Sequence, residues 1–236
     1  MKIGVLQTGH INELLADKYP AYPVMFEQML GPVDSSFTFA GYRVVDGEFP
    51  QHASECDAWV ISGSRHGAYE DHDWIPPLEE LIRQIVALKI PVIGVCFGHQ
   101  IMAQALGGTV VKWPGGWGLG RQTYSWGEAE RSEEVELYAL HQDQVTVAPE
   151  GAEVIASNGF CEIAGLRYSP TAISVQPHPE FSADYMNDLI DVMEAAGRLS
   201  AADAARGRTA MAGPVDNAKF AQQFGSFIKS KSARAA

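Results

Sequence analysis

The residue that most restricts the fold of this chain is Cys96, because a glycine stands two positions before it and another two positions after it. The apolar stretch 91–95 predicts a short buried strand. The stretch 97–106 has apolar residues at helical spacing, and the glycines at 107–108 predict its end. A cysteine on a tight turn between a strand and a helix is typical of a nucleophile elbow, where glycines let neighbouring backbones pass close to the turn.

Cys96 has two interpretations at this point. A lone cysteine after an apolar strand is most often a small core residue. At the N-terminus of a helix, however, a cysteine is favoured in its thiolate form, which attacks carbonyl carbons. The two glycines and the change from strand to helix favour the second interpretation, which also requires a base elsewhere in the chain.

The composition restricts the class of protein. The chain has 236 residues, 46% of them hydrophobic, which predicts one sizeable α/β domain over residues 1–236. A formal net charge of −12 opposes binding to nucleic acid. The three cysteines, Cys56, Cys96 and Cys161, are too widely spaced for a disulfide framework or a zinc site, so we expect a reducing compartment and no metal.

The hydropathy of the chain predicts a cytoplasmic protein. Its first residues enter a strand directly, without the charged and then apolar leader of a secreted protein. No apolar run approaches the length of a membrane span, so no membrane contact is expected.

Strands and helices alternate in the first half of the chain. Amphipathic helices are expected at 22–30 and 74–88, and this order predicts a mostly parallel sheet with helices on both faces. The strands are expected at 2–7, 37–45, 58–61 and 91–95.

The second half of the chain has a different pattern of predicted elements. Short strands separated by turn signals predict antiparallel hairpins added to the sheet, and the C-terminal segment of about 182–236 is expected to be helical. Within it, the weakly patterned stretch 201–214 is expected to be an exposed connection. The strands are expected at 109–111, 121–126, 136–140, 154–156, 162–168 and 172–176.

A second motif, His178 and Glu180 between prolines, follows the last of these strands. Two residues apart in extended backbone, their side chains lie on one face, and the prolines keep the segment extended. The carboxylate can then orient the imidazole and stabilise its charged form. Such a pair alone is more typical of a solvated loop, but with Cys96 it supplies the base that a cysteine nucleophile needs.

The two motifs, GVCFGHQ at 94–100 and VQPHPE at 175–180, together resemble the class I, or triad, glutamine amidotransferases. The resemblance covers about residues 2–188 and is to the stand-alone branch, which is similar to the amidotransferase domain of GMP synthetase. It implies a flavodoxin-like sheet and a triad with Cys96 as nucleophile, His178 as general base and acid, and Glu180 as orienting group.

The resemblance also implies an oxyanion hole. Gly63 and Ser64 match the strand end from which a backbone N–H, most simply that of Ser64, pairs with the N–H of Phe97. The family usually has Gly-Pro where this chain has Ser64 and Arg65. Without the resemblance, this loop would be read as an ordinary turn.

Three further positions match family residues that hold the amino-acid end of glutamine. They are Gln100, otherwise an exposed helix residue, and Leu140 and His141 in a segment whose backbone contributes. We expect the side chain of His141 to be structural.

The other histidines are not assigned to the site. His99 is expected to pack structurally, whereas His10, His52, His66 and His72 are expected to be surface or loop residues.

The implied reaction is attack of the Cys96 thiolate on the side-chain amide of glutamine. His178 protonates the departing ammonia, and water hydrolyses the γ-glutamyl thioester to glutamate without a cofactor or metal. No phosphate-binding loop is present, so an amidotransferase would need a separate synthetase subunit.

Two alternatives stay open. A γ-glutamyl peptidase or γ-glutamyl amide hydrolase would use the same triad to expel a larger amine, and a non-catalytic binding or regulatory module would keep only the fold. The loop 113–120 is expected to be packed, with a leaving-group pocket or a partner surface as the alternative.

Overall fold

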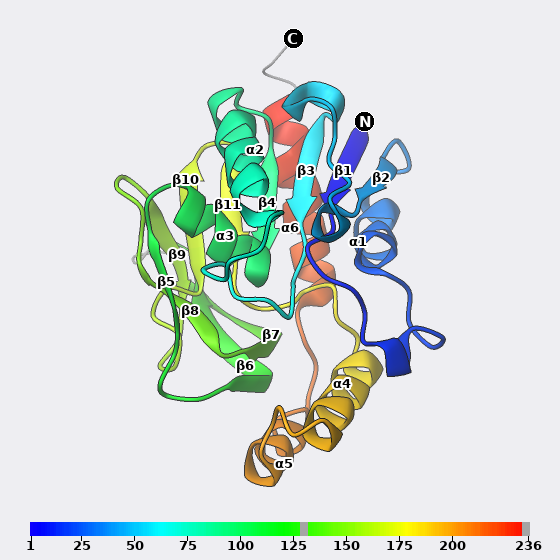
Figure 1. The fold of residues 1–236 in the computed structure, drawn as a ribbon, viewed down its shortest axis with the longest axis vertical. Coiled ribbons are helices and arrows are strands. Elements are labelled where there is room, and N and C mark those ends of the chain that lie inside the picture. The colour runs from blue at the N-terminus through cyan, green and yellow to red at the C-terminus, as the bar shows by residue number, and fades with distance from the viewer. Residues whose placement is uncertain (128–131, 233–236) are drawn as a thin grey trace.

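The computed structural model describes residues 1–127 and 132–232, and it is built around a nine-stranded sheet (Figure 1). The strand order is β2-β1-β3-β4-β11-β10-β9-β6-β7, and neighbours among the first five strands in this order are parallel. These five strands are β1 (Lys2–Leu6), β2 (Thr38–Tyr42), β3 (Ala58–Ile61), β4 (Val92–Val95) and β11 (Ala172–Val175).

The remaining strands extend this sheet by antiparallel pairing. The predicted α/β fold, with a flavodoxin-like parallel sheet and added antiparallel strands, is therefore confirmed. The added strands are β6 (Gly118–Trp126), β7 (Glu133–His141), β9 (Glu153–Ser157) and β10 (Gly165–Ser169), and β5 (Thr109–Lys112) pairs with β8 (Asp143–Val147) in a second, two-stranded sheet.

Helices cover both faces of the parallel strands, as predicted (Figure 1). Successive strand residues point to opposite faces, so Val60 packs in the core under α1 and α6, while Trp59 and Ile61 pack under α2 and α3. The bounds are α1 (Tyr22–Leu30), α2 (Ile75–Ala87), α3 (Phe97–Ala105) and α6 (Asn217–Ser232), and short 3₁₀ turns lie at Glu13–Leu15, Gly31–Val33, Val44–Asp46 and Ala53–Glu55.

Two helices, α4 (Ala183–Ala195) and α5 (Ala201–Thr209), extend beyond the end of the sheet (Figure 1). The stretch 201–214 is mostly exposed, as expected, but it contains the helix α5, which was not predicted. Ser200 caps α5 by accepting a hydrogen bond from the N–H of Asp203 at 3.1 Å. Only Ala204 and Gly207 of this helix are buried, so the sequence has no apolar stripe to reveal it.

Several strand boundaries differ from the predicted ones, and one strand is additional. The strand β2 ends at Tyr42 because a 3₁₀ turn begins at Val44, β6 begins inside the glycine-rich stretch 113–120, and β8 is additional. The predicted helical segment 182–236 holds α4, α5 and α6, and residues 233–236 lie outside the described part of the chain. Within the described residues, no helix is both long and apolar enough to cross a membrane.

Candidate active site

Cys96 occupies the turn between β4 and α3, where its backbone has φ 54° and ψ −104°. A positive φ is rare for a residue with a side chain, so surrounding structure must hold it. The N–H of Cys96 donates to the carbonyl of Val175 in β11 at 2.9 Å, and its side chain is 6% exposed. The predicted strand-turn-helix elbow is confirmed.

The two flanking glycines are required by close backbone approaches. A Cβ on Gly94 would lie 2.4 Å from the carbonyl oxygen of Gly98, and a Cβ on Gly98 would lie 2.3 Å from that of Ile61. The N–H of Gly98 also donates to the carbonyl of Ser62 at 3.1 Å. The elbow is therefore packed directly against the end of β3.

His178 and Glu180 follow β11 and lie together, as their spacing predicts. Nδ1 of His178 donates to Oε1 of Glu180 at 2.8 Å, and the two side chains are 3% and 0% exposed. The ring of Phe181 stacks on the imidazole with centroids 3.9 Å apart. The N–H of His178 donates to the carbonyl of Tyr138 at 2.8 Å, which holds the segment against β7.

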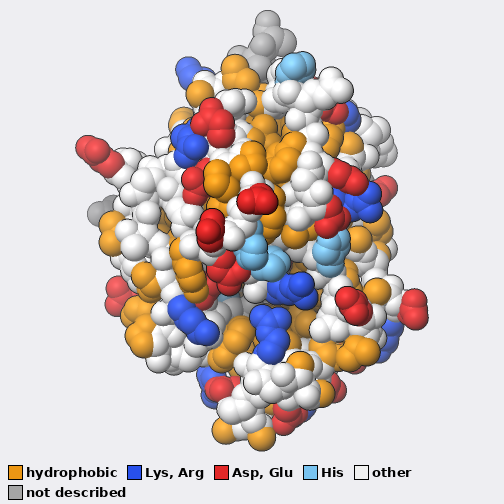
Figure 2. Space-filling model, viewed as in Figure 1, with side chains coloured by type: hydrophobic (Ala, Val, Ile, Leu, Met, Phe, Trp, Pro, Cys, Tyr) orange, Lys and Arg blue, Asp and Glu red, His pale blue; other side chains and the backbone are white. Residues whose placement is uncertain are grey.

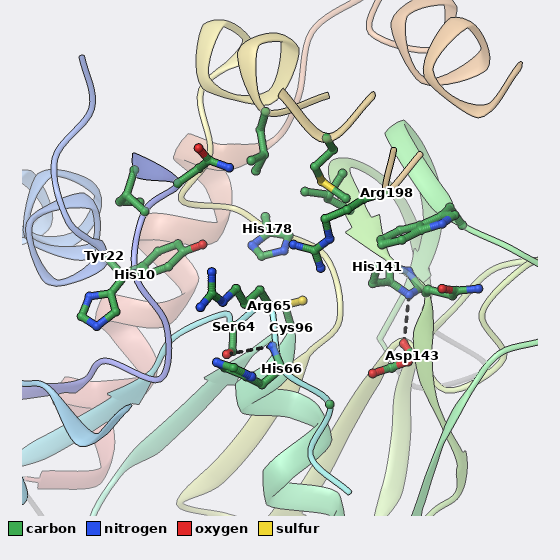
Figure 3. A pocket seen from close by; sticks show the side chains of 18 of the residues that line it. His10, Tyr22, Ser64, Arg65, His66, Cys96, His141, Asp143, His178 and Arg198 are labelled. Atoms are coloured by element: carbon green, nitrogen blue, oxygen red, sulfur yellow. Dashed lines mark hydrogen bonds between the residues drawn. The ribbon is translucent and has the colours of Figure 1, made fainter. Parts of the chain in front are cut away.

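The imidazole of His178 is also close to Cys96. A Cβ on Gly63 would lie 3.0 Å from Cε1 of His178 and 3.8 Å from Cβ of Cys96, so the two side chains meet at this glycine (Figure 3). Burial lowers the pKa of His178, but the negative charges of Glu180 and Cys96 outweigh burial and raise it to about 10. The charged imidazolium is therefore the favoured form at neutral pH.

The loop with Gly63 and Ser64 is fixed by the end of β1. The N–H of Thr8 donates to Oγ of Ser62 at 3.0 Å, and its hydroxyl donates to the carbonyl of Gly63 at 3.1 Å. Phe97 is the first residue of α3, so its N–H has no acceptor within the helix. The structure thus brings Gly63 and Phe97 beside Cys96, and the assignment of individual oxyanion donors stays a prediction.

Gln100 is buried, 3% exposed, so the alternative of an exposed helix residue is wrong. Its amide nitrogen donates to the carbonyl of Asp143 at 3.0 Å and to Oε1 of Gln176 at 3.1 Å. Gln100 therefore ties α3 to the segment 140–143, the same segment that was predicted to hold substrate.

His141 and the half-buried Leu140 line the same pocket as Cys96. Nδ1 of His141 lies 3.2 Å from the carbonyl of Asp143, while its Nε2 is buried without a hydrogen-bond partner among the described residues. Burial lowers the pKa of His141 to about 3, so its imidazole is neutral and its Nε2 is a free acceptor when Nδ1 donates.

The pocket that contains Cys96 and His178 has a volume of about 970 Å³. Its wall is formed by the loops 10–16 and 64–70, the segment 140–143, and side chains of α4. Lys, Arg and His side chains gather at a hollow near the centre of one face (Figure 2).

Sequence reasoning missed two arginines in this wall, Arg65 and Arg198. Both are exposed, and they point into the pocket near His178 (Figure 3). Neither guanidinium forms an ion pair or a side-chain hydrogen bond with any described residue. The replacement of Gly-Pro by Ser64 and Arg65 was a signal for the first arginine, whereas nothing in the sequence connects position 198 with position 96.

The remaining histidines divide into two groups. His99 is fully buried, with Nδ1 2.7 Å from Oγ of Ser174, and packs structurally as predicted; His52 is exposed. His10, His66 and His72 lie in loops, as expected. His10 and His66 also line the pocket, and His72 lies against His66 with ring centroids 4.4 Å apart.

With this geometry in view, comparison with known proteins is informative. The model of the family "Glutamine amidotransferase class-I" matches residues 27–190. The chain belongs to this family. It is 33% identical over 201 residues to gamma-glutamyl peptidase 4 of Arabidopsis thaliana, which covers 80% of this chain and 79% of that protein.

Two further similar proteins support the resemblance to glutamine amidotransferases that the motifs at 94–100 and 175–180 indicated. A GMP synthase (glutamine-hydrolyzing) of Aromatoleum aromaticum is 32% identical over 140 residues, 51% of this chain and 25% of that protein. A solved glutamine amidotransferase from Thermotoga maritima superposes with a TM-score of 0.72 at 20% identity, covering 99% of this chain and 97% of that chain, which shows the shared fold.

Proposed function

We propose that this protein is a cysteine-dependent hydrolase of γ-glutamyl amides whose leaving group is an amino acid or short peptide. The observation that carries the proposal is the pocket of about 970 Å³ with Arg65 and Arg198 beyond Cys96. Pockets of that size accommodate ligands considerably larger than one amino acid. The similarity to gamma-glutamyl peptidase 4 supports the same substrate class.

In the first chemical step, Sγ of Cys96 attacks the γ-carbonyl carbon of the substrate. The N–H groups of Phe97 and Ser64 stabilise the oxyanion that forms. As the C–N bond breaks, the imidazolium of His178 gives its proton to the departing amine, and the γ-glutamyl group stays on sulfur as a thioester.

In the second step, neutral His178 takes a proton from water, and the resulting hydroxide attacks the thioester. The C–S bond breaks and restores the sulfur anion beside the imidazolium, and glutamate leaves with a new γ-carboxyl group that gives its proton to solvent to become a carboxylate. Glu180 holds Nδ1–H of His178 throughout and stabilises its positive charge, consistent with the 2.8 Å hydrogen bond between them.

The two ends of the substrate occupy different parts of the pocket in this proposal. Gln100, Leu140 and His141 hold the α-amino-acid end of the γ-glutamyl group. Arg65 and Arg198 bind the carboxylate of the leaving amino acid, because guanidiniums without an acidic partner in the described part of the chain favour an anion.

The test is release of glutamate and amine from glutamine and from a panel of γ-glutamyl dipeptides, amides and anilides. We expect kcat/KM to be at least about tenfold higher for dipeptides than for glutamine. In a variant with Arg65→Met and Arg198→Met, KM for dipeptides should rise by about ten- to a hundredfold, with a much smaller change for amides that lack the carboxylate. Arg83→Met, on the remote helix α2, is the matched control.

A second function is supported by the similarity to a GMP synthase. The chain would then release ammonia from glutamine for a separate synthetase subunit. This function would be favoured over a peptidase if glutamine were hydrolysed as fast as or faster than every other substrate of the panel and the arginine substitutions left its hydrolysis unchanged. If the wild-type protein hydrolyses none of these substrates, the result would instead indicate a non-catalytic module.

A further inference from the structure

The loop between β3 and α2 contains a cluster of three potential metal ligands: His66, Glu70 and His72. Nδ1 of His66 lies 3.2 Å from Oε2 of Glu70, and Nε2 of His72 lies 2.8 Å from the same oxygen. The three ligand atoms all lie within 4.8 Å of one another. Two imidazoles thus converge on a single carboxylate oxygen.

Local packing holds these side chains in place. The ring of His72 stacks on Trp74 with an interplanar angle of 13°, and the ring of His66 meets the same indole edge-on. Trp74 is only 8% exposed and packs against Phe97. A ligand set supported by a buried indole loses little conformational entropy when it binds an ion.

The backbone of this loop is also ordered by hydrogen bonds. The N–H of Glu70 donates to the carbonyl of Gly67 at 3.1 Å, and the N–H of Ile75 donates to that of His72 at 3.0 Å. The N–H of His66 donates to Oγ of Ser64 at 3.2 Å (Figure 3). The three ligands therefore lie on a turn that is ordered by backbone hydrogen bonds and that leads into the first residue of α2.

We propose that His66, Glu70 and His72 bind one divalent transition-metal ion of the Zn²⁺ class. Two imidazoles and a carboxylate are a common ligand set for zinc, with bonds of about 2.0–2.2 Å. Neighbouring ligands of a tetrahedral site with such bonds are about 3.3 Å apart, close to the 3.2 and 2.8 Å that separate the His66 and His72 nitrogens from Oε2 of Glu70.

The surroundings favour a cation at this position. Glu70 is followed by Asp71 and Asp73, so the loop contributes three carboxylates against one guanidinium, that of Arg65. Both His66 and Glu70 line the pocket that holds Cys96. Three protein ligands leave a fourth position for water or for an electron-pair donor of a bound molecule.

This site was not predicted from the sequence, where the cysteine spacing was taken to exclude a metal. The relevant spacing is instead His-x-x-x-Glu-x-His at 66–72. It falls in a loop, so no helical or strand periodicity brings the three side chains to one face. The reversal of the chain at Gly67–Glu70 does so.

The test uses full-length Cys96→Ala protein stripped with EDTA, because Cys96 and His178 are themselves possible metal ligands. Titration with Co²⁺ should give visible absorption of a tetrahedral complex that saturates at one ion per chain. Isothermal titration with Zn²⁺ should give the same stoichiometry, with a dissociation constant on the order of 10 µM or tighter.

Variants Glu70→Gln and His72→Asn should each weaken binding by at least about tenfold. The control His52→Asn removes an exposed histidine elsewhere and should bind as its parent does. Circular dichroism and thermal melting of each metal-free variant establish that it is folded. Absence of a one-to-one complex, or equal binding by the three variants, would overturn the proposal.

Discussion

The inner and outer parts of the pocket are built in different ways. The inner part, Cys96, His178 and Glu180, stands at the ends of adjacent parallel strands, and its side chains are almost completely buried. The outer part is formed by exposed side chains on connections, with Arg65 after β3 and Arg198 between α4 and α5.

In the proposed function, this difference in construction separates the residues that carry out the reaction from those that select the substrate. The inner groups are held by strand pairing, close glycine contacts and a strained backbone at Cys96, so their geometry tolerates little change. The outer groups rest on loops and helix ends, where substitutions alter recognition without disturbing the core. In the function proposed above, the inner set carries out the hydrolysis and the outer set determines the leaving-group preference.

The largest effect is expected from removing the nucleophile. Cys96→Ala should lower kcat by at least about 10³-fold, because no other group forms the thioester. Release of glutamate from a γ-glutamyl dipeptide measures the loss. The control Cys56→Ala changes another buried cysteine, in a different hydrophobic cluster, and should stay within about threefold of wild type. Equal losses in both variants would contradict the assignment of Cys96.

The next largest effect is expected from Glu180→Gln. The substitution keeps the shape but removes the charge that stabilises the imidazolium, so kcat should fall by about 10²–10⁴-fold. The same change should lower the pKa of His178, which NMR of the imidazole resonances measures.

Glu180→Gln also has a consequence for stability. Because folding raises the pKa of His178 from 6.5 to about 10, the folded state keeps its proton where the unfolded state has lost it. This contribution is complete below about pH 6.5 and disappears as the pH rises toward 10. Urea denaturation across this range should show a decline in wild type that is smaller in the variant; identical slopes would contradict the charge assignment.

A third prediction concerns the packing of the elbow. Gly98→Ala places a Cβ against the backbone of Ile61, so the free energy of unfolding should fall by about 1–3 kcal/mol. Gly159→Ala is the matched control, since no described residue other than its chain neighbours has an atom within 4 Å of the added Cβ, and it should change stability by less than about 0.5 kcal/mol. Chemical denaturation distinguishes the two, and comparable losses would mean that the elbow is not tightly packed.

The smallest effect is expected at the outer wall. Arg65→Met alone should leave the melting temperature unchanged and kcat/KM for glutamine within about threefold of wild type, because this exposed guanidinium has no ion pair among the described residues. Steady-state assays and a thermal melt measure both quantities. If Arg65→Met lowered glutamine hydrolysis as much as Glu180→Gln does, Arg65 would belong to the inner part of the pocket. The distinction between the inner and outer parts would then be wrong.

Local rules were sufficient for much of the fold and of the inner site. The glycines around Cys96 predicted the elbow, and the spacing of His178 and Glu180 predicted their hydrogen bond. Each of these two signals is contained within a few consecutive residues, so local geometry is enough to interpret it. The helix α5 escaped prediction because its stability comes from an N-cap and two small buried residues rather than from an apolar stripe.

The outer part of the site could not be predicted from the sequence for another reason. Arg198 lines the pocket because it follows α4, whose side chains Leu189 and Met193 line the same wall. The cluster of His66, Glu70 and His72 depends on an irregular turn. Such juxtapositions follow from tertiary structure, and a period of two or 3.6 residues does not encode them.

The most direct test of the account is a search for the γ-glutamyl thioester at Cys96. Wild-type protein is mixed with a γ-glutamyl dipeptide, quenched with acid within milliseconds, and analysed by intact-mass and peptide mass spectrometry. We predict a transient mass increase of one γ-glutamyl group on the peptide that contains Cys96, absent from the Cys96→Ala variant. Turnover with no such adduct at any quench time, or an adduct on another residue, would contradict the central claim.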